Sequence, residues 1–515
     1  MWNTLGAGLV LGLVLVTSGS LSNAQGTSVR QFAPDGRQGL QGCRLPGVEH
    51  EALCGSLRRP LDVKQPNGAT IELHFAVLPA LARNRKPDPV LFFAGGPGQS
   101  AIELAGPVGR MLARLGNRRD IVLVDQRGTG RSAPLACAEV PVDAPLADAA
   151  DPVRQRQRLQ ACVQALQRLP HGDLRHFTTW VATQDVDAVR QALGAQVVNL
   201  VGGSYGTRVA LDYQRQYPQR VRRTVIDGVA PPDVHLTEAA ATDNQAALDA
   251  VFAACDAHAR CRQRYPGLRQ DWQRLLASLP RTVAALHPVS GQAEPLLLTR
   301  AVLLSWVRAP LYTPLLASAL PLAISEASQN RFEPLLGLAS ALAGRRQGRL
   351  YEGMHFAVMC SEDVTRLESA PALANDFGDS FTVQYRQICR DWPRAEVPAA
   401  FYRVAPAPSA TLLFSGGADP VTPTRLGEHA ARALGAQARH VVVPHAGHGL
   451  LGLACLRDVL FKFIDAETDA EALRVDANCA ASLPRPLPYV PLLGGHAGST
   501  TASATAIAAS LGARR

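Results

Sequence analysis

Several short runs of apolar residues, each followed by a glycine-rich or polar turn, constrain the fold of this chain more than any other feature. A continuous apolar run of about four to eight residues is typical of a strand that is buried on both faces of a sheet. The runs, with their turns, are PVLFFAGGPG (89–98), DIVLVDQRGTG (120–130), VVNLVGG (197–203) and RTVIDGVAPP (223–232).

Helix-like stretches separate these runs, and an alternating segment precedes them. TTWVATQDVDAVRQALG (178–194) has a helical pattern, and its last residue, Gly194, stands where helices commonly end in glycine. IELHFAVL (71–78) alternates apolar and polar residues, as a half-buried strand does. Strands separated by helices predict an α/β fold, in which helices cover both faces of a mostly parallel sheet.

The pattern of strands and glycine-rich turns is interrupted once. Helical stretches rich in Ala, Leu and Arg replace it from about residue 236 to 400, and two strand-and-turn segments, ATLLFSGGADPVTP (410–423) and ARHVVVPHAGHG (438–449), then follow. We therefore expect a sheet domain in two parts with a helical cap inserted between them. The expected boundaries are 25–235 and 401–482 for the sheet domain and 236–400 for the cap.

Both ends of the chain differ from the rest. LGAGLVLGLVLV (5–16) is apolar but too short to span a bilayer, and Ser22-Asn23-Ala24 has the small-x-small spacing of a signal-peptidase site. Residues 1–24 are therefore interpreted as a signal peptide, with an uncleaved anchor as the alternative. The stretch 483–515 is rich in Pro and then in Ser, Thr, Ala and Gly, which predicts a flexible tail.

The ten cysteines agree with export to an oxidising compartment, outside the cell or in a periplasm. None forms a CxxC pair, and a zinc site would need tighter Cys/His clustering. Sequence does not fix their connectivity. They fall in sequential couples: Cys43/Cys54, Cys137/Cys162, Cys255/Cys261, Cys360/Cys389 and Cys455/Cys479. After signal cleavage we expect no stable membrane insertion.

Charge and motifs argue against nucleic acid, nucleotide and metal ligands. The net charge of +9 is spread thinly, and the basic stretch 215–223 lacks interleaved aromatic residues. Residues 128–133 fit the dinucleotide pattern GxGxxA, but Pro134 follows where a helix should continue. Asp125 and Arg127 are instead expected to brace loops near the site. The sequence predicts no cofactor and no metal, and it leaves the oligomeric state open.

The motif GGSYG (202–206) stands between a strand and a helix, the setting of a serine held on a tight turn. In that setting we interpret Ser204 as a nucleophile rather than a solvated turn residue. The backbone N–H of Tyr205 would be one donor to the oxyanion that forms during acyl transfer, and that of Gly96, in the AGGPG turn, the other.

A nucleophilic serine needs a base, and the base needs a carboxylate to orient it. His448 lies between two glycines after the last strand and is preferred as base over His445, which is nearer the strand end. The two form an HxxH pair without an evident third metal ligand. Asp419 is preferred as the orienting acid, and Asp227, after the strand that follows Ser204, is the alternative. The order Ser, Asp, His is that of α/β-hydrolases.

Five motifs in order, AGGPG, DQRGTGRS, GGSYG, GGADPVTP and HAGHG, resemble those of α/β-hydrolase serine peptidases of the prolyl iminopeptidase and tripeptidyl aminopeptidase family. The resemblance covers about residues 65–235 and 400–465 and implies the α/β-hydrolase fold with Ser204, Asp419 and His448 as its triad. Ala94 departs from the pattern, because many relatives have His before GGPG.

Family members that trim peptides hold the free amino terminus of the substrate with acidic cap residues. The resemblance makes Glu362 and Asp363, in VMCSEDV, the candidates here. The expected function is a secreted or periplasmic serine hydrolase that releases proline or short peptides from free N-termini. The alternatives are a carboxylesterase acting on small acyl substrates and a non-catalytic binding protein of the same fold.

Overall fold

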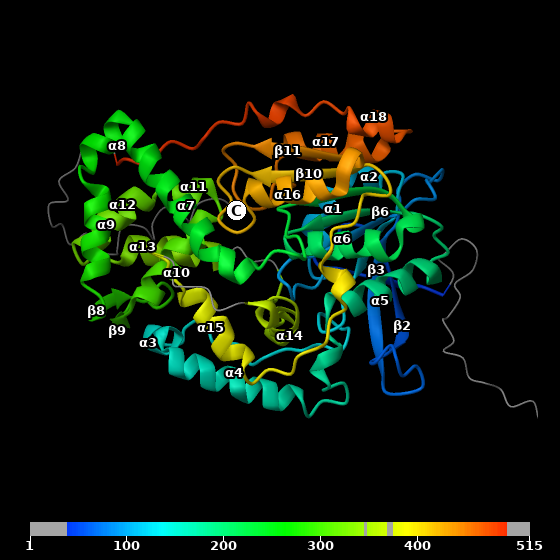
Figure 1. Cartoon of the computed structure of the whole chain (residues 1–515), viewed down its shortest axis with the longest axis horizontal. Coiled ribbons are helices and arrows are strands. Elements are labelled where there is room, and N and C mark those ends of the chain that lie inside the picture. Colours follow the sequence, from blue (N-terminus) through cyan, green and yellow to red (C-terminus); the bar gives the residue numbers. More distant parts are fainter. Residues whose placement is uncertain (1–38, 344–347, 368–373, 492–515) are drawn as a thin grey trace, which may run out of the picture.

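A computed structural model describes residues 39–343, 348–367 and 374–491 (Figure 1). A sheet with helices on both faces forms one side of the molecule, and a helical cap lies beyond one edge of it. The predicted signal peptide and most of the predicted tail lie outside the described residues. Within those ranges, no helix is long and apolar enough to cross a membrane.

The described part of the chain contains a nine-stranded sheet in the order β1-β2-β3-β5-β4-β6-β7-β10-β11. In this order, the first three pairs, β1-β2, β2-β3 and β3-β5, are antiparallel. The remaining five pairs, from β5-β4 to β10-β11, are parallel. This arrangement confirms the predicted mostly parallel sheet. The strands are β1 (Gln41–Cys43), β2 (Ala52–Pro60), β3 (Thr70–Leu78), β4 (Val90–Phe93), β5 (Ile121–Val124), β6 (Val198–Gly203), β7 (Val221–Asp227), β10 (Thr411–Gly416) and β11 (Ala438–Val443).

Side chains of each central strand alternate between two separate hydrophobic cores. In β4, Leu91 and Phe93 belong to one core, whereas Val90 and Phe92 belong to the other. This two-sided burial explains why these strands are apolar at every position. The first core includes residues of α5 (Thr179–Ala192), α6 (Tyr205–Gln216) and α16 (Thr424–Leu434), and the second includes residues of α1 (Ala105–Met111), α2 (Ala113–Gly116), α17 (Ala454–Asp465) and α18 (Asp469–Leu473).

The cap has a hydrophobic core of its own around the fully buried Trp272. It also contains an antiparallel hairpin, which was not expected from the helical composition of this region. The cap elements are α7 (Leu236–Ala257), α8 (Ala259–Arg264), α9 (Leu268–Ala277), β8 (Arg281–Leu286), β9 (Ala293–Leu298), α10 (Arg300–Leu311), α11 (Pro314–Ala317), α12 (Leu320–Ser328) and α13 (Glu333–Ala343).

Four further helices complete this region: α3 (Leu146–Ala150), α4 (Pro152–Leu166), α14 (Glu352–Glu362) and α15 (Ser380–Cys389). In Figure 1, α14 and α15 lie between the cap and the sheet, whereas α3 lies below the cap and α4 runs along the lower edge. The Leu146 amide at the start of α3 donates a hydrogen bond to Glu294 of β9. Short 3-10 turns are found at Leu174–His176, Pro218–Arg220, Val364–Arg366, Ala399–Tyr402, Gly435–Gln437 and Asn478–Ala480.

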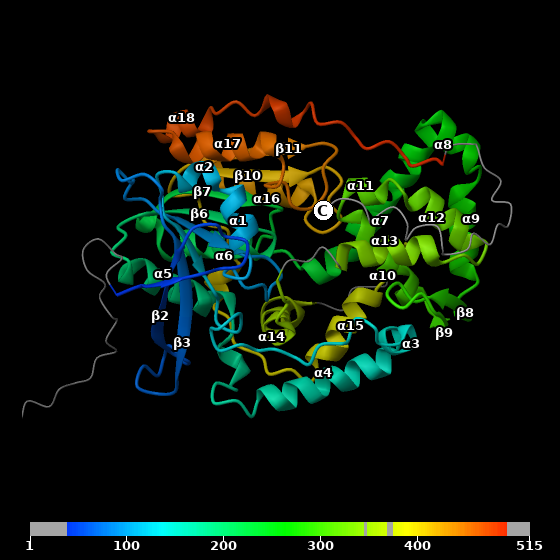
Figure 2. The same cartoon turned by 180° about the vertical axis from the view of Figure 1, so that it is seen from behind.

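The chain after α18 returns across the molecule to the cap, as the reverse view shows (Figure 2). Arg485 donates a hydrogen bond to the Ala250 carbonyl on α7, and the Tyr489 amide donates to the Ser318 carbonyl. The described beginning of the predicted tail is therefore hydrogen-bonded to the cap.

All ten cysteines pair in the sequential couples noted in the sequence. The bridge between Cys360 and Cys389 joins α14 to α15, which are separated by 29 residues along the chain, whereas Cys255 and Cys261, at the α7–α8 junction, are only 6 residues apart. A disulfide stabilises a fold mainly by restricting the unfolded chain, so the longer loop should contribute more.

We expect the double variant Cys360→Ala/Cys389→Ala to lose about 3.5 kcal/mol of unfolding free energy and Cys255→Ala/Cys261→Ala about 2 kcal/mol. Urea denaturation of the two variants and the wild type measures both losses. A larger loss from the shorter loop would contradict the loop-length argument.

Candidate active site

Ser204 occupies a strained turn between β6 and α6. Its φ of 56° and ψ of −124° are rarely adopted by residues other than glycine. The two flanking glycines are required by close backbone contacts: a Cβ on Gly206 would lie 2.2 Å from the Phe93 carbonyl oxygen, and one on Gly202 would lie 2.4 Å from the Gly206 oxygen. The Ser204 amide donates to the Asp227 carbonyl at 2.8 Å. This turn is the one that GGSYG predicts.

His448 and Asp419 come from the loops that follow β11 and β10. Because these strands are parallel neighbours, their loops emerge at the same edge of the sheet. His448 Nδ1 lies 2.8 Å from Asp419 Oδ2, and the Thr422 hydroxyl donates to the same oxygen at 2.7 Å. The amides of Val421 and Thr422 donate to Asp419 Oδ1. The carboxylate is thus fixed against Nδ1, which leaves Nε2 as the ring nitrogen available to a substrate or nucleophile.

Asp419 and His448 each shift the pKa of the other toward the charged form. Burial by itself lowers the pKa of His448, but the charge and hydrogen bond of Asp419 outweigh it and hold that pKa above its usual value. Burial likewise raises the pKa of Asp419, but His448 and the hydrogen bonds from Thr422 bring it below the usual range. Both shifts favour the charged pair that proton transfer to the imidazole would create.

The two residues considered as alternatives, Asp227 and His445, have other contacts. Asp227 Oδ2 accepts hydrogen bonds from the amides of Leu450 at 2.6 Å and Leu451 at 2.9 Å, just after His448. Burial raises the pKa of Asp227 to about 6. Asp227 therefore holds the backbone of the histidine loop, whereas Asp419 contacts the imidazole. His445 is exposed and lines a different hollow, between the sheet domain and the cap.

The AGGPG turn lies against the serine. A Cβ on Gly95 would be 3.3 Å from Ser204 Cβ, and Gly96 has a φ of 110°. Tyr205 is the first residue of α6, so its amide has no acceptor within the helix. Gly96 and Tyr205 line the same cavity as Ser204, and their amides stay the candidates for the oxyanion donors.

Asp125 supports the segment that follows this turn. Its buried carboxylate accepts hydrogen bonds from the Ser100 hydroxyl at 2.5 Å and the Ile102 amide at 3.1 Å. The Tyr351 amide also donates to the Gly98 carbonyl. Arg127 donates hydrogen bonds to Asp185 of α5 and to the carbonyls of Pro60, Leu61 and His176, so it joins the end of β2 to α5.

Ser204, Tyr205, Gly96 and His448 line one cavity of about 650 Å³. The cap and the helices beside it close the cavity with many aromatic and apolar side chains and with some polar and charged ones, Glu352 and His355 included. Among them are Arg308, Tyr312, Phe356, Met359, Phe381 and Tyr385. None of these six was singled out in the sequence, because such lining residues are dispersed and follow no motif.

Tyr312 of the cap contacts the loop that carries His448 directly. The His448 amide donates to the Tyr312 carbonyl at 2.9 Å, and the two rings meet edge to face with centroids 5.5 Å apart. A Cβ on Gly447 would lie 2.3 Å from that carbonyl oxygen, which explains the glycine before His448.

Glu362 and Asp363, at the end of α14, are each only 1% exposed, and neither is among the residues that line the cavity in the described part of the chain. Glu362 accepts hydrogen bonds from the Thr179 amide at 2.6 Å and hydroxyl at 2.9 Å, and burial raises its pKa to about 7. Asp363 pairs with Arg208 at 2.7 Å, and Arg208 does line the cavity. Thr179 and Arg208 were not anticipated from the sequence.

We expect Asp227→Ala to lower the free energy of unfolding by about 1–3 kcal/mol, since two buried amides lose their acceptor. Asp227→Asn keeps an oxygen in place and should lose less than half as much. Urea denaturation measures both. Equal losses would contradict a role of the Asp227 oxygen as acceptor for Leu450 and Leu451.

The sequence was compared with known proteins. Residues 88–453 match the family model described as the alpha/beta hydrolase fold. Serine protease Hip1 of Mycobacterium tuberculosis is 27% identical over 424 residues, which cover 76% of this chain and 80% of that protein. Tripeptidyl aminopeptidase of Streptomyces lividans is 32% identical over 190 residues, 35% of each chain. Proline iminopeptidase of Neisseria meningitidis is 31% identical over 142 residues, 27% of this chain and 32% of that protein.

Proposed function

The chain belongs to the α/β-hydrolase fold family, and we propose that it is a secreted or periplasmic serine peptidase that removes proline or short peptides from free N-termini. The observation that carries this proposal is the hydrogen bond between His448 and Asp419, at the edge of a cavity that Ser204 also lines. The names of the relatives, a serine protease and two aminopeptidases, support peptides as substrates.

In the proposed mechanism, Ser204 Oγ attacks the scissile carbonyl while His448 Nε2 takes its proton. Asp419 keeps the imidazole in the required tautomer and stabilises its charge. The amides of Tyr205 and Gly96 donate to the oxyanion of the tetrahedral intermediate. His448 then protonates the leaving amine, and water hydrolyses the acyl-enzyme with His448 as base.

Export of the protein is supported by two independent features. The first 24 residues have the pattern of a signal peptide, and five disulfides join the described cysteines. Disulfides persist outside the reducing cytosol, so both features favour a secreted or periplasmic location.

Glu362 and Asp363 are the candidates to bind the substrate's amino group. Their carboxylates already have partners, Thr179 for Glu362 and Arg208 for Asp363. Each oxygen of Glu362 accepts one hydrogen bond from Thr179 and has capacity for a second, which an ammonium group would use. An esterase needs no such contact, so dependence on the amine separates the two activities.

We expect a fluorophosphonate probe to label the wild-type protein at Ser204 and to leave Ser204→Ala unlabelled. Because protonated His448 cannot accept the serine proton, the labelling rate should fall as the pH drops through the raised pKa of His448. Mass spectrometry of the labelled peptide at several pH values between about 5 and 9 measures this rate.

Asp419→Asn is the matched control for this profile. It removes the charge that raises the pKa of His448, so the acid limb should move to lower pH and the rate should fall by roughly 10³–10⁴. Wild-type protein that folds but is not labelled would support the alternative of a non-catalytic binding protein.

We expect a peptide with a free amino terminus to be cleaved at least about tenfold faster, in kcat/KM, than its N-acetylated copy, because acetylation removes a charged hydrogen-bond donor. A fluorogenic panel of one-, two- and three-residue acyl groups, each with a free and an acetylated amine, measures this ratio and the preferred number of residues. Equal cleavage of both forms, with fast turnover of simple esters, would indicate the esterase instead.

A further inference from the structure

We propose that Arg308 makes the catalytic cavity selective for substrates that carry a carboxylate on the leaving side of the scissile bond. This inference rests on the proposed function and narrows its substrate class.

Arg308 lies on α10, one turn before Tyr312, and lines the cavity together with Ser204 and His448. Its guanidinium carbon is 4.8 Å from the centre of the Phe381 ring and 5.6 Å from that of Tyr312. Its Nη2 donates to the Tyr312 hydroxyl at 3.0 Å. Two aromatic faces and one hydrogen bond thus hold a half-buried cation in a fixed place.

This cation is uncompensated. Within residues 39–343, 348–367 and 374–491, no carboxylate forms an ion pair with Arg308, and its buried Nε has no acceptor. A guanidinium has five N–H donors and stays charged, so leaving it partly buried and unpaired costs free energy. An anionic ligand would remove that cost, and a carboxylate matches the guanidinium in shape and charge.

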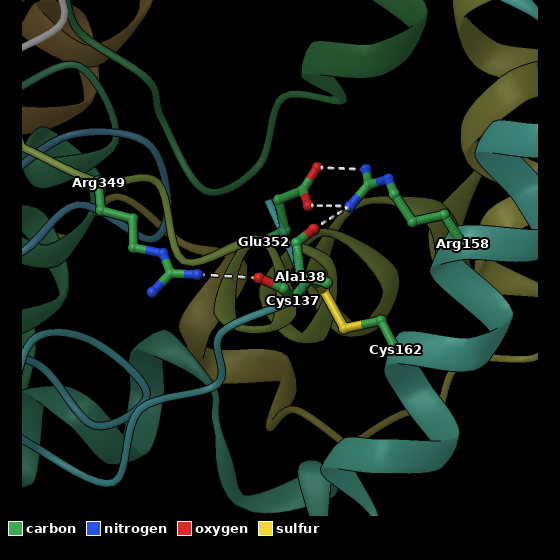
Figure 3. The surroundings of a disulfide bond; sticks show 6 residues. All are labelled: Cys137, Ala138, Arg158, Cys162, Arg349 and Glu352. Carbon is green, nitrogen blue, oxygen red and sulfur yellow. Dashed lines mark hydrogen bonds and ion pairs between the residues drawn. A yellow bond between two sulfur atoms is a disulfide. The ribbon is translucent and has the colours of Figure 1, made fainter. Parts of the chain in front are cut away.

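Two other charged side chains of the cavity, Arg208 and Glu352, already have ion-pair partners. Arg208 pairs with Asp363, and both carboxylate oxygens of Glu352 accept hydrogen bonds from Arg158 (Figure 3). The disulfide between Cys137 and Cys162 lies beside this pair and joins the loop after β5 to α4, the helix of Arg158. Asp227 also lines the cavity, but it accepts hydrogen bonds from the Leu450 and Leu451 amides and forms no ion pair with Arg308 in the described part of the chain.

The position of Arg308 indicates which part of the substrate it would meet. The Tyr312 ring is packed against both the guanidinium and the imidazole of His448, with ring centroids 5.5 Å apart in the second contact. His448 is the group that protonates the leaving amine. A carboxylate bound at Arg308 therefore belongs to the leaving fragment: either the free C-terminus of a short peptide or an acidic side chain next to the cleaved bond.

Pairs of peptides with free amino termini distinguish the two sources of the carboxylate, the C-terminus and an acidic side chain. Pro-Ala and Ala-Ala-Pro-Ala are each compared as C-terminal acid and C-terminal amide. Pro-Glu amide and Ala-Ala-Pro-Glu amide are compared with the corresponding Gln amides. We expect wild-type kcat/KM to favour the carboxylate member of at least one arm by about tenfold or more, mainly through KM, since hydrogen bonds to charged groups contribute about 1.5–3 kcal/mol.

Arg308→Met should remove this preference, so that the ratio of kcat/KM between the charged and the neutral member of each pair falls to about one. Arg308→Lys keeps the charge but not the fork of donors, so it should retain part of the preference. Arg300→Met is the matched control, because Arg300 lies on the same helix, is exposed and binds the Asp376 carbonyl away from the cavity. It should behave like wild type.

Two results would overturn the inference. One is equal wild-type kcat/KM within every acid–amide and Glu–Gln pair. The other is an equal loss on charged and neutral substrates in Arg308→Met, which would assign Arg308 only to the support of Tyr312 and the histidine loop.

Failure of the proposed function has a different signature. If Ser204 is labelled but no peptide is cleaved, the peptidase proposal fails while the cavity is still testable with esters. The acetate esters of 4-hydroxybenzoate and of 4-hydroxybenzamide differ only by a carboxylate on the leaving group. A wild-type preference for the first that Arg308→Met abolishes supports the inference, and its absence overturns it.

Discussion

The loop that carries His448 depends on hydrogen bonds from three separate parts of the chain. Asp419 fixes the imidazole, Asp227 holds the two amides that follow at Leu450 and Leu451, and the Tyr312 carbonyl accepts from the His448 amide itself. Asp227 also connects this loop to the serine, because its backbone carbonyl accepts from the Ser204 amide. Serine and histidine are thus placed relative to each other through one aspartate that touches neither functional atom.

The cap is part of this arrangement and not a separate cover. Tyr312 reaches the histidine loop, Arg308 adds a fixed positive charge beside it, and aromatic side chains of α15 complete the wall. The sheet domain supplies the groups that break an acyl bond, and the cap sets the charge and shape of the space around that bond. A family that keeps its sheet and exchanges its cap can therefore change substrates while retaining one chemistry.

The features that were predicted correctly from the sequence are those that a short local pattern determines. The buried strands, the turn at Ser204 and the loops that carry Asp419 and His448 are each encoded within a few residues, by apolar runs and by glycines that permit close backbone contact. The hairpin of β8 and β9 escaped prediction because its residues lie in a region of helical composition. Strands β1 and β2 have exposed and intermediate positions and do not form apolar runs.

Residues that act through long-range contacts could not be predicted in the same way. Glu362 was chosen from a resemblance, but its burial against Thr179 depends on how α14 packs on α5, some 180 positions away in the chain. Arg308 and Tyr312 belong to no motif, and their importance depends on the cap being folded over the sheet domain.

The path of the chain after α18 has a consequence for access to the cavity. The hydrogen bonds of Arg485 and Tyr489 connect the chain that leaves the sheet domain to the cap. The Leu146 amide donates to Glu294 of β9, and the Tyr312 carbonyl accepts from the histidine loop. A cap attached at several points is expected to resist hinge-like opening. We would then expect an unfolded chain end to enter the cavity more readily than a folded domain.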